Sequence, residues 1–157
     1  MYQIGDKVVY PMHGAGIIDR IEEKTILGES RRYYVLNVSS GDMKVMIPVD
    51  KCEDIGIRHI IEKEEVENVL EVLEGPSTPM SDNWNRRNRE NMELLKTGDI
   101  RKVAGVVRNL IRVERTKPLS TGEKKMLSNA RQILESELIL TMGKEAGEVA
   151  EIVENHV

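Results

Sequence analysis

Trp84 lies among polar and basic residues, in the segment Asn83-Trp84-Asn85-Arg86-Arg87-Asn88-Arg89. It is the one tryptophan of a 157-residue chain that contains no phenylalanine, and a protein with so few aromatic side chains usually buries them. A large apolar ring beside three arginines suits a surface that faces phosphates and wedges the ring between bases. The alternative is a ring packed beneath its own helix, with the arginines in solvent. The residue pattern leaves both interpretations open.

Basic residues concentrate in one stretch of an otherwise acidic chain. Residues 83–131 carry eight Arg and five Lys against five acids, a net charge of +8, whereas the whole chain has −4. Residues 50–82 and 132–157 are acidic, with net charges of −7 and −5. This block favours a local surface for a polyanion, although charges dispersed around several helices would give the same counts.

Catalytic, metal-binding and cofactor-binding patterns are missing from the sequence, so we expect no enzyme activity, no metal and no cofactor. Gly14-Ala15-Gly16 begins like a dinucleotide fingerprint, but no third glycine follows. His13, His59 and His156 are isolated from one another, which gives no metal-ligand spacing. The single Cys52 excludes an internal disulfide and fits a reducing compartment.

Composition indicates a globular, cytoplasmic protein. Charged residues make up 32% of the chain and hydrophobic residues 39%, which is typical of soluble domains. The N-terminal residues lack the basic run and apolar stretch of a secretory signal. No apolar segment approaches the roughly 20 residues that span a bilayer, so we expect no membrane contact.

The elements that must position these residues differ between the two halves. The first sixty residues predict short strands with glycine at each reversal, at Lys7–Tyr10, Ile17–Glu22, Arg31–Val38 and Met43–Pro48. Residues 11–16, 27–30 and 39–42 are the expected turns, and Pro48 should end its strand because it cannot donate to a ladder. Strands at this spacing indicate a small antiparallel barrel.

After Arg58 the apolar period changes from two to nearly four, which predicts helices. Val66, Val69, Leu70 and Leu73 form one stripe, on a helix that ends at Gly75-Pro76. Ser81 or Asp82 is expected to cap a helix from Trp84 to Lys96, and Asp99 to begin the next. Ser120 and Glu123 fit a capping box, in which each side chain satisfies the other's backbone donor, for a helix ending at Gly143.

The expected fold class is therefore α+β, with a barrel domain at residues 1–58 and an all-α bundle at residues 59–157. On the helix that begins at Asp99, four arginines fall within a narrow sector flanking the apolar face: Arg101, Arg108, Arg112 and Arg115. They could form a ridge that contacts DNA, or a solvated face. We give the ridge less weight than Trp84 as a DNA contact.

Longer segments resemble the CarD/CdnL family of bacterial RNA-polymerase-binding transcription regulators. The resemblance is carried by the N-terminal segment 5–16, by Asn83–Arg87, by Lys102–Leu110, and by Leu119–Leu127 with Ala130–Leu134 after it. It covers nearly the whole chain, and the Asn-Trp and Gly-Glu-Lys segments together are its most specific part. The N-terminal signature is less specific, because a similar small barrel occurs in the transcription-repair coupling factor.

The resemblance implies a Tudor-like barrel that docks on the β subunit of RNA polymerase by strand addition, and a helical domain that contacts promoter DNA. Carried over by position, the docking edge would involve Lys24, Thr25 and Ile26 with a facing strand around Val45 and Met46. Family members often have arginine where this chain has Met46, so a salt bridge is in doubt there. Lys24 keeps a charge without the bidentate geometry of arginine.

On the DNA side the resemblance makes Trp84 the wedge residue and assigns backbone contacts to Arg86, Arg87, Arg89 and Lys124. The expected function is stabilisation of the open promoter complex at the upstream edge of the bubble. Contacts would be to the minor groove and phosphates, without sequence preference, and the protein is expected to be a monomer located at the nucleoid through polymerase. The alternative is a polymerase- or protein-binding adaptor without DNA contact.

Overall fold

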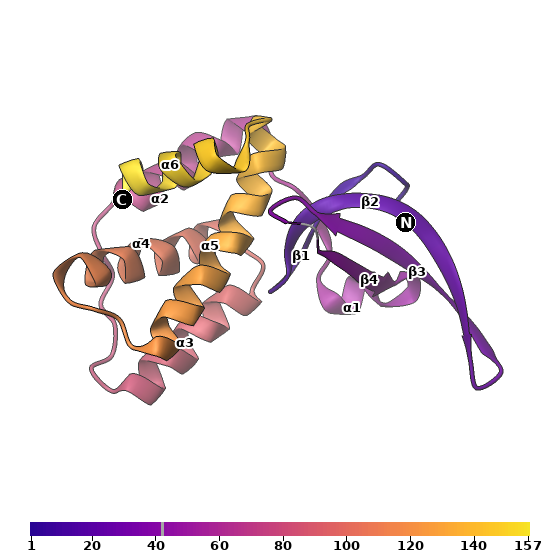
Figure 1. Ribbon diagram of the computed structural model, residues 1–157, viewed down its shortest axis with the longest axis horizontal. Helices are drawn as coiled ribbons and strands as arrows, with labels where there is room; N and C mark the ends of the chain where they lie inside the picture. Colours follow the sequence, from indigo (N-terminus) through magenta and orange to yellow (C-terminus); the bar gives the residue numbers. More distant parts are fainter. Residues whose placement is uncertain (42) are drawn as a thin grey trace.

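The computed structural model describes residues 1–41 and 43–157, and it places an N-terminal sheet beside a C-terminal group of helices (Figure 1). The predicted α+β class, with strands first and helices second, is confirmed. Five antiparallel strands of the described chain follow the spatial order β4-β3-β2-β1-β5. They are β1 (Lys7–Tyr10), β2 (Gly14–Ile26), β3 (Glu29–Val38), β4 (Lys44–Pro48) and β5 (Arg58–His59). Asp42, in the predicted turn 39–42, lies outside the described residues.

The sheet is open, where the sequence predicted a closed barrel. Over the described residues, β4 and β5 lie at opposite edges and do not pair with each other. The chain between them is helical, because Val49–Lys51 forms a 3-10 turn and Cys52–Ile55 forms α1. Pro48 ends β4, as expected of a residue that has no N–H to donate. β5 is only two residues long and pairs only with β1 in the described chain.

β2 and β3 are longer than predicted and continue past their neighbours as a two-stranded ribbon. β1 pairs with β2 only as far as Ile17, and β4 pairs with β3 only as far as Tyr33. Beyond these points residues 23–32, which we call the ribbon tip, pair only with each other in the described chain. Figure 1 shows the ribbon tip extending away from the helices.

The helical half surrounds its own core. After a 3-10 turn at Lys63–Glu65 come α2 (Val66–Glu74), α3 (Trp84–Lys96), α4 (Ile100–Thr116), α5 (Thr121–Met142) and α6 (Ala146–His156). Leu73, Leu95, Leu110 and Leu134 meet in the centre of this core and have no exposed surface. The predicted apolar stripe of α2 is confirmed, since all four of its residues are buried. A separate core beneath the sheet includes Val8, Tyr34 and Leu36.

Among residues 43–157, three helices begin at capping residues, and at one of them the cap differs from the predicted residue. Asp99 and Ser120 cap α4 and α5, accepting from the backbone N–H groups of Arg101 and Glu123. At α3 the cap is Asn83, whose side-chain oxygen accepts from the backbone N–H of Arg86 at 3.0 Å. The prediction of Ser81 or Asp82 was wrong because the helix begins at Trp84, one residue later than a cap at Asp82 would require and two later than a cap at Ser81.

Polar contacts join the two halves along α5, at a surface we call the joint. Glu137 of α5 is 2% exposed, and its carboxylate accepts from both terminal guanidinium nitrogens of Arg58 at 2.7 and 2.8 Å. The same carboxylate accepts from the backbone N–H of Ile61 at 2.8 Å. The backbone N–H of Ala15 in β2 donates to the hydroxyl of Ser136 at 2.8 Å. Because these contacts are short and largely buried, the joint fixes how the sheet sits on the helices.

Candidate nucleic-acid and protein interfaces

Trp84 is the first residue of α3, and 45% of its surface is exposed. The cap at Asn83 orders the backbone immediately before it. One edge of the indole lies over the first turn of α5, where a Cβ built on Gly122 would come within 3.2 Å of Trp84 Cζ2. The ring is therefore neither enclosed in a core nor free in solvent, and about half of it faces outward.

A shallow groove of about 370 Å³ runs beside the indole, between α3 and α5. Apolar and amide groups and one lysine line it: Trp84, Asn88, Met92, Gly122, Lys125, Met126 and Asn129. Met92 and Met126 also pack against the helical core, so the groove floor is continuous with a rigid part of the protein. This support gives a half-exposed ring a defined position.

Arg87 and Glu123 connect the starts of α3 and α5. The guanidinium of Arg87 donates to the two carboxylate oxygens of Glu123 at 3.0 and 3.2 Å, and to the backbone carbonyl of Ser81 at 3.0 Å. The two side chains are only 21% and 11% exposed. Arg87 therefore points into the protein, and Glu123 uses its carboxylate here instead of completing the predicted capping box. The Glu123 N–H donates to the Ser120 hydroxyl at 3.2 Å, and that hydroxyl donates to the Glu123 carboxylate at 3.5 Å.

The other basic residues predicted at this surface face solvent. Arg86, Arg89 and Lys124 are all exposed. Arg86 pairs with Glu90 one turn further along α3 at 2.7 Å, a surface pair that is open to competition from other anions. The starts of α3 and α5 also meet here, and each carries the partial positive charge of a helix N-terminus. The local chemistry thus combines an apolar ring with cations and favours anions around it.

The arginine ridge predicted on α4 is not a continuous free surface, because its two middle arginines contact α2. Arg108 is 6% exposed and donates to the Val72 carbonyl at 2.9 Å. Arg112 donates to the Leu73 carbonyl at 3.1 Å. Both guanidinium groups thus satisfy carbonyls in the last turn of α2, where the helix dipole favours cations. Burial and the neighbouring charge of Arg112 lower the pKa of Arg108.

The ends of the same ridge are also engaged within the protein. Arg101 pairs with Glu65 at 2.6 Å, a contact that lowers the pKa of that carboxyl group. Arg115 donates to the backbone carbonyls of Glu154 and Val157 in the last residues of the chain. The helical period located the sector correctly. α2 covers its middle at Arg108, whereas Arg101 and Arg115 at its ends are about half exposed and are held in surface ion pairs.

The residues predicted to bind polymerase fall in two separate places on the sheet. Lys24, Thr25 and Ile26 belong to the ribbon tip, are exposed, and pair with residues 29–31 of β3. Val45 and Met46 lie in β4, are partly buried, and pair with residues 35–36 of the same strand. β3 separates the two segments, so they do not face each other. The strand around Val45 and Met46 therefore does not face Lys24–Ile26 as expected, and the assignment of both segments to polymerase binding stays a prediction.

Each segment has an edge that could accept another strand. The outer side of β4 is unpaired over the described residues, and so are both sides of the ribbon tip. Unpaired N–H and C=O groups at a sheet edge are a template for strand addition. β4 is short, and Lys44 and Pro48 at its ends restrict where a partner strand could pair.

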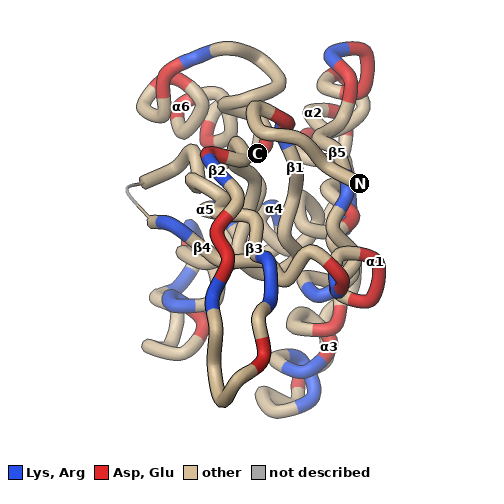
Figure 2. The backbone as a smooth tube through the Cα atoms, turned by 90° about the vertical axis from the view of Figure 1, so that its right-hand side faces the viewer, with Lys and Arg blue, Asp and Glu red and all other residues tan. Residues whose placement is uncertain are grey.

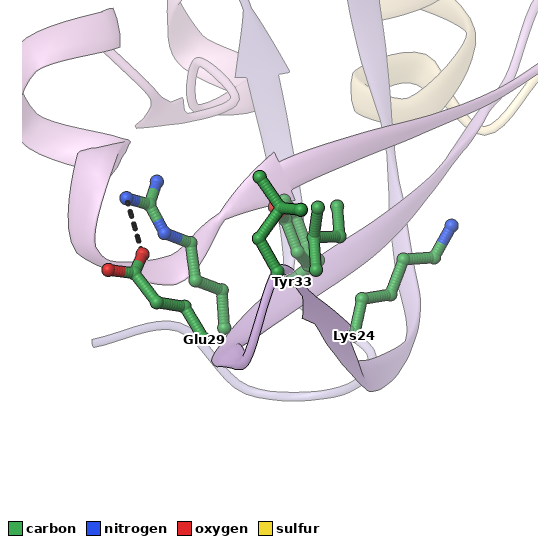
Figure 3. A pocket seen from close by; sticks show the side chains of 6 residues that line it. Lys24, Glu29 and Tyr33 are labelled. Atoms are coloured by element: carbon green, nitrogen blue, oxygen red, sulfur yellow. Dashed lines mark ion pairs between the residues drawn. The ribbon is translucent and has the colours of Figure 1, made fainter.

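One face of the ribbon forms a groove of about 360 Å³ (Figure 3). Both strands and the turn contribute to it, through Lys24, Ile26, Leu27, Glu29, Arg31 and Tyr33. Figure 3 shows Lys24 and Glu29 on either side of Tyr33. Viewed from this side, charged residues of both signs flank an uncharged turn (Figure 2). The face therefore offers apolar contact area with a polar rim, as protein-binding surfaces do.

Sequence reasoning missed several residues that build these surfaces. Gly122, Lys125 and Asn129 border the indole groove, and Leu27 is 99% exposed at the ribbon turn. The capping box marked the start of α5, but nothing in its pattern showed that Glu123 would reach across to α3. Only the packing of helices that are distant in sequence brings these groups together.

Two absences apply to residues 1–41 and 43–157. No group of three or more His, Cys, Asp and Glu side chains there is arranged to hold a metal ion. Every helix in that part of the chain is too short or too polar to span a bilayer.

Comparisons with known proteins agree with this division into two parts. Residues 2–61 match the family described as CarD-like/TRCF RID domain, and residues 68–154 match the family described as CarD, C-terminal domain. A protein of Bacillus subtilis (strain 168) described as "Putative transcription factor YdeB" is 42% identical over 143 residues. That alignment covers 91% of this chain and 94% of the relative.

Among solved structures, the solution NMR structure of the 72-residue N-terminal domain of Myxococcus xanthus CarD is 29% identical, with a TM-score of 0.33. It covers 38% of this chain and 79% of that domain. The two family matches together span both halves, and the Bacillus relative aligns across them. The chain therefore belongs to the CarD family of transcription factors.

Proposed function

We propose that this protein binds RNA polymerase through its sheet and stabilises the open promoter complex through the Trp84 surface, without acting as an enzyme. The observation that carries the proposal is the half-exposed indole, which one side of α5 supports and which shares its groove with Lys125. A solvent-facing tryptophan on a firm base suits insertion between bases better than it suits a core.

Insertion of Trp84 is effective only where DNA is already distorted. Unstacking one base step costs about a few kcal/mol, more than a few phosphate contacts supply on free duplex DNA. RNA polymerase melts the promoter itself, so a ring at the upstream edge of the bubble needs only to oppose reannealing. The wedge therefore stabilises an existing opening and does not create one.

Phosphate contacts place the ring on the DNA. Arg86 and Arg89 are exposed on the same helix as Trp84, and Lys124 is exposed on the first turn of α5; all three provide charge without base readout. Arg87 has a different role in this scheme, because its guanidinium holds Glu123 and supports the surface from within. Binding should be insensitive to sequence, sensitive to salt and weak on free DNA.

The sheet supplies the affinity that the DNA surface lacks. β4 offers an unpaired edge in the described chain, and the ribbon tip adds an exposed apolar turn. A protein held on polymerase reaches the promoter at a high effective concentration, so a weak DNA contact becomes occupied. The joint keeps the two surfaces at a fixed separation.

The test compares Trp84→Ala with Leu94→Ala in open-complex lifetime assays with polymerase and promoter. Leu94 is the matched control, since it is a large apolar residue on the same helix and is 37% exposed. We expect Trp84→Ala to shorten the lifetime by roughly tenfold, as loss of one stacking contact worth about 1–3 kcal/mol implies. Leu94→Ala should leave it unchanged, and both variants should bind polymerase normally.

Equal lifetimes for Trp84→Ala and the unsubstituted protein would contradict the wedge. With polymerase binding intact, that result would instead favour an adaptor that recruits another protein. Loss of helical structure in Trp84→Ala, measured by circular dichroism, would show that the ring belongs to the core and would also overturn the proposal.

A further inference from the structure

Gly122 occupies a position where the backbone does not require glycine. It is the second residue of α5, lies on the protein surface, and is not among the glycines with positive φ. Its backbone is therefore ordinary helix, a conformation in which alanine loses less conformational freedom on folding than glycine does. Something other than main-chain geometry must account for the missing side chain.

The indole of Trp84 provides that reason. A Cβ at Gly122 would lie 3.2 Å from Trp84 Cζ2 and 3.9 Å from Cη2, and the shorter contact is below ordinary van der Waals separation. Any side chain at residue 122 would therefore push the ring away from α5. The ion pair of Arg87 with Glu123, one residue along α5, prevents the helix starts from separating to make room.

We propose that Gly122 is a positioning residue for Trp84, and that its bare backbone forms the seat that fixes the angle at which the indole leaves the surface. This inference rests on the proposed wedge function, because the angle matters only if the ring enters DNA. Trp84 lies on the first turn of α3, and its side chain has two rotatable torsions. Without contact with Gly122, the ring could occupy other rotamers.

Gly147 provides an unusually close control. It is the second residue of α6, as Gly122 is of α5, and it is also exposed. A Cβ at Gly147 meets nothing within 4 Å. Alanine at either position adds the same methyl group and the same helix propensity, but only alanine at position 122 touches the indole.

The experiment measures Gly122→Ala and Gly147→Ala, first in the free protein and then in the open complex. In the free protein, the fluorescence of the single tryptophan reports directly on the ring. We expect Gly122→Ala to raise acrylamide quenching and lower fluorescence anisotropy, while its melting temperature stays equal or rises. Gly147→Ala should leave the fluorescence unchanged. Gly122→Leu should enlarge both optical changes, because its side chain is bulkier.

In the open complex, Gly122→Ala should shorten the lifetime by about two- to fivefold, since a contact group displaced by a few tenths of an ångström loses part of its effect. Unchanged quenching and anisotropy in Gly122→Ala would contradict the positioning role of Gly122. Altered quenching and anisotropy with an unchanged open-complex lifetime would contradict it as well. Trp84→Ala separates the two proposals. If that variant shortens the lifetime and Gly122→Ala does not, the wedge survives and the positioning role fails.

Discussion

The Trp84 surface and the ribbon tip are both exposed, yet they are built in opposite ways. Trp84 is held by a helix cap, a glycine seat and the buried fork between Arg87 and Glu123. The ribbon tip is held by cross-strand bonds, including one between the hydroxyls of Thr25 and Ser30 at 2.9 Å, and by a surface ion pair of Arg31 with Glu29; all ten of its residues are exposed. One surface is supported by the core beneath it, and the other extends past the core.

This difference matches the work proposed for each surface. A ring that is already held in one position loses little conformational entropy when it inserts between bases. Rigidity in the free protein therefore adds directly to the stability of the open complex. A ribbon that pairs with another protein can gain order from its partner, because strand addition supplies new backbone bonds. The DNA side should therefore be sensitive to mutations beneath the surface, whereas the polymerase side should be sensitive to mutations on it.

The largest expected effect comes from the joint, to which both surfaces are attached. Glu137→Ala leaves the guanidinium of Arg58 without its carboxylate in a largely buried site. Loss of one partner of a buried pair costs about 3–5 kcal/mol, and partial exposure of Arg58 places this case near 3 kcal/mol. Chemical denaturation measures the loss. Glu93→Ala, which removes an exposed carboxylate on α3, is the control and should change stability by less than about 0.5 kcal/mol.

The second-largest effect compares two ion pairs made by adjacent arginines of α3, Arg86 and Arg87. Glu123→Ala removes the carboxylate that Arg87 requires, and we expect a loss of about 2 kcal/mol together with faster motion of the indole. Glu90→Ala removes the surface partner of Arg86 and should cost no more than about 0.5 kcal/mol. Thermal melts and Trp84 anisotropy measure both quantities. Similar losses in the two variants would break the proposed distinction between a supported interior pair and a surface pair.

The ribbon tip should show the reverse relation between stability and binding. Leu27 has φ +52 and Gly28 has φ +80, the two positive values of a type I′ turn. Leucine is a poor residue for that conformation, so Leu27→Asn should raise stability by about 0.5–1 kcal/mol. Because Leu27 is also 99% exposed, we expect the same variant to bind polymerase more weakly, measured by titration. Tighter or unchanged binding would remove the ribbon turn from the proposed interface.

The smallest effects belong to the exposed cations around Trp84. Arg89→Gln and Lys124→Gln should leave stability within about 0.5 kcal/mol, since both side chains lie in solvent. In a salt series on the promoter complex, each should lower the slope of log affinity against log salt by about one. Lys96→Gln, at the opposite end of α3, serves as the control and should leave the slope unaltered.

Local patterns were enough to predict much of the fold. Asp99 and Ser120 start helices as their side chains predict, because capping depends on residues only three apart. Trp84 stood out from composition and from its arginine neighbours. The sheet's failure to close was not visible, since the helical turn at Val49–Lys51 interrupts the chain just where a strand would have had to continue.

The arginines show where local reasoning ends. A helical wheel placed Arg108 and Arg112 correctly on the flank of an apolar face, but it could not show that the last carbonyls of α2 lie there. Likewise Arg86 and Arg87 are adjacent in sequence, yet one faces solvent and the other reaches Glu123 on another helix. Which helix covers which sector is a property of tertiary packing, and no single segment encodes it.

The joint also has a consequence for where the protein can act. β2 lies so close to α5 that a Cβ on Gly14 would come within 2.8 Å of the Ser136 hydroxyl, so the two halves are packed directly against each other at the joint. In the proposed assembly the distance between the sheet surface and Trp84 is therefore the same at every promoter. The protein then contacts the promoter at one distance from the polymerase surface to which it binds. The geometry of the polymerase, and not the DNA sequence, thus selects the base step that receives the indole.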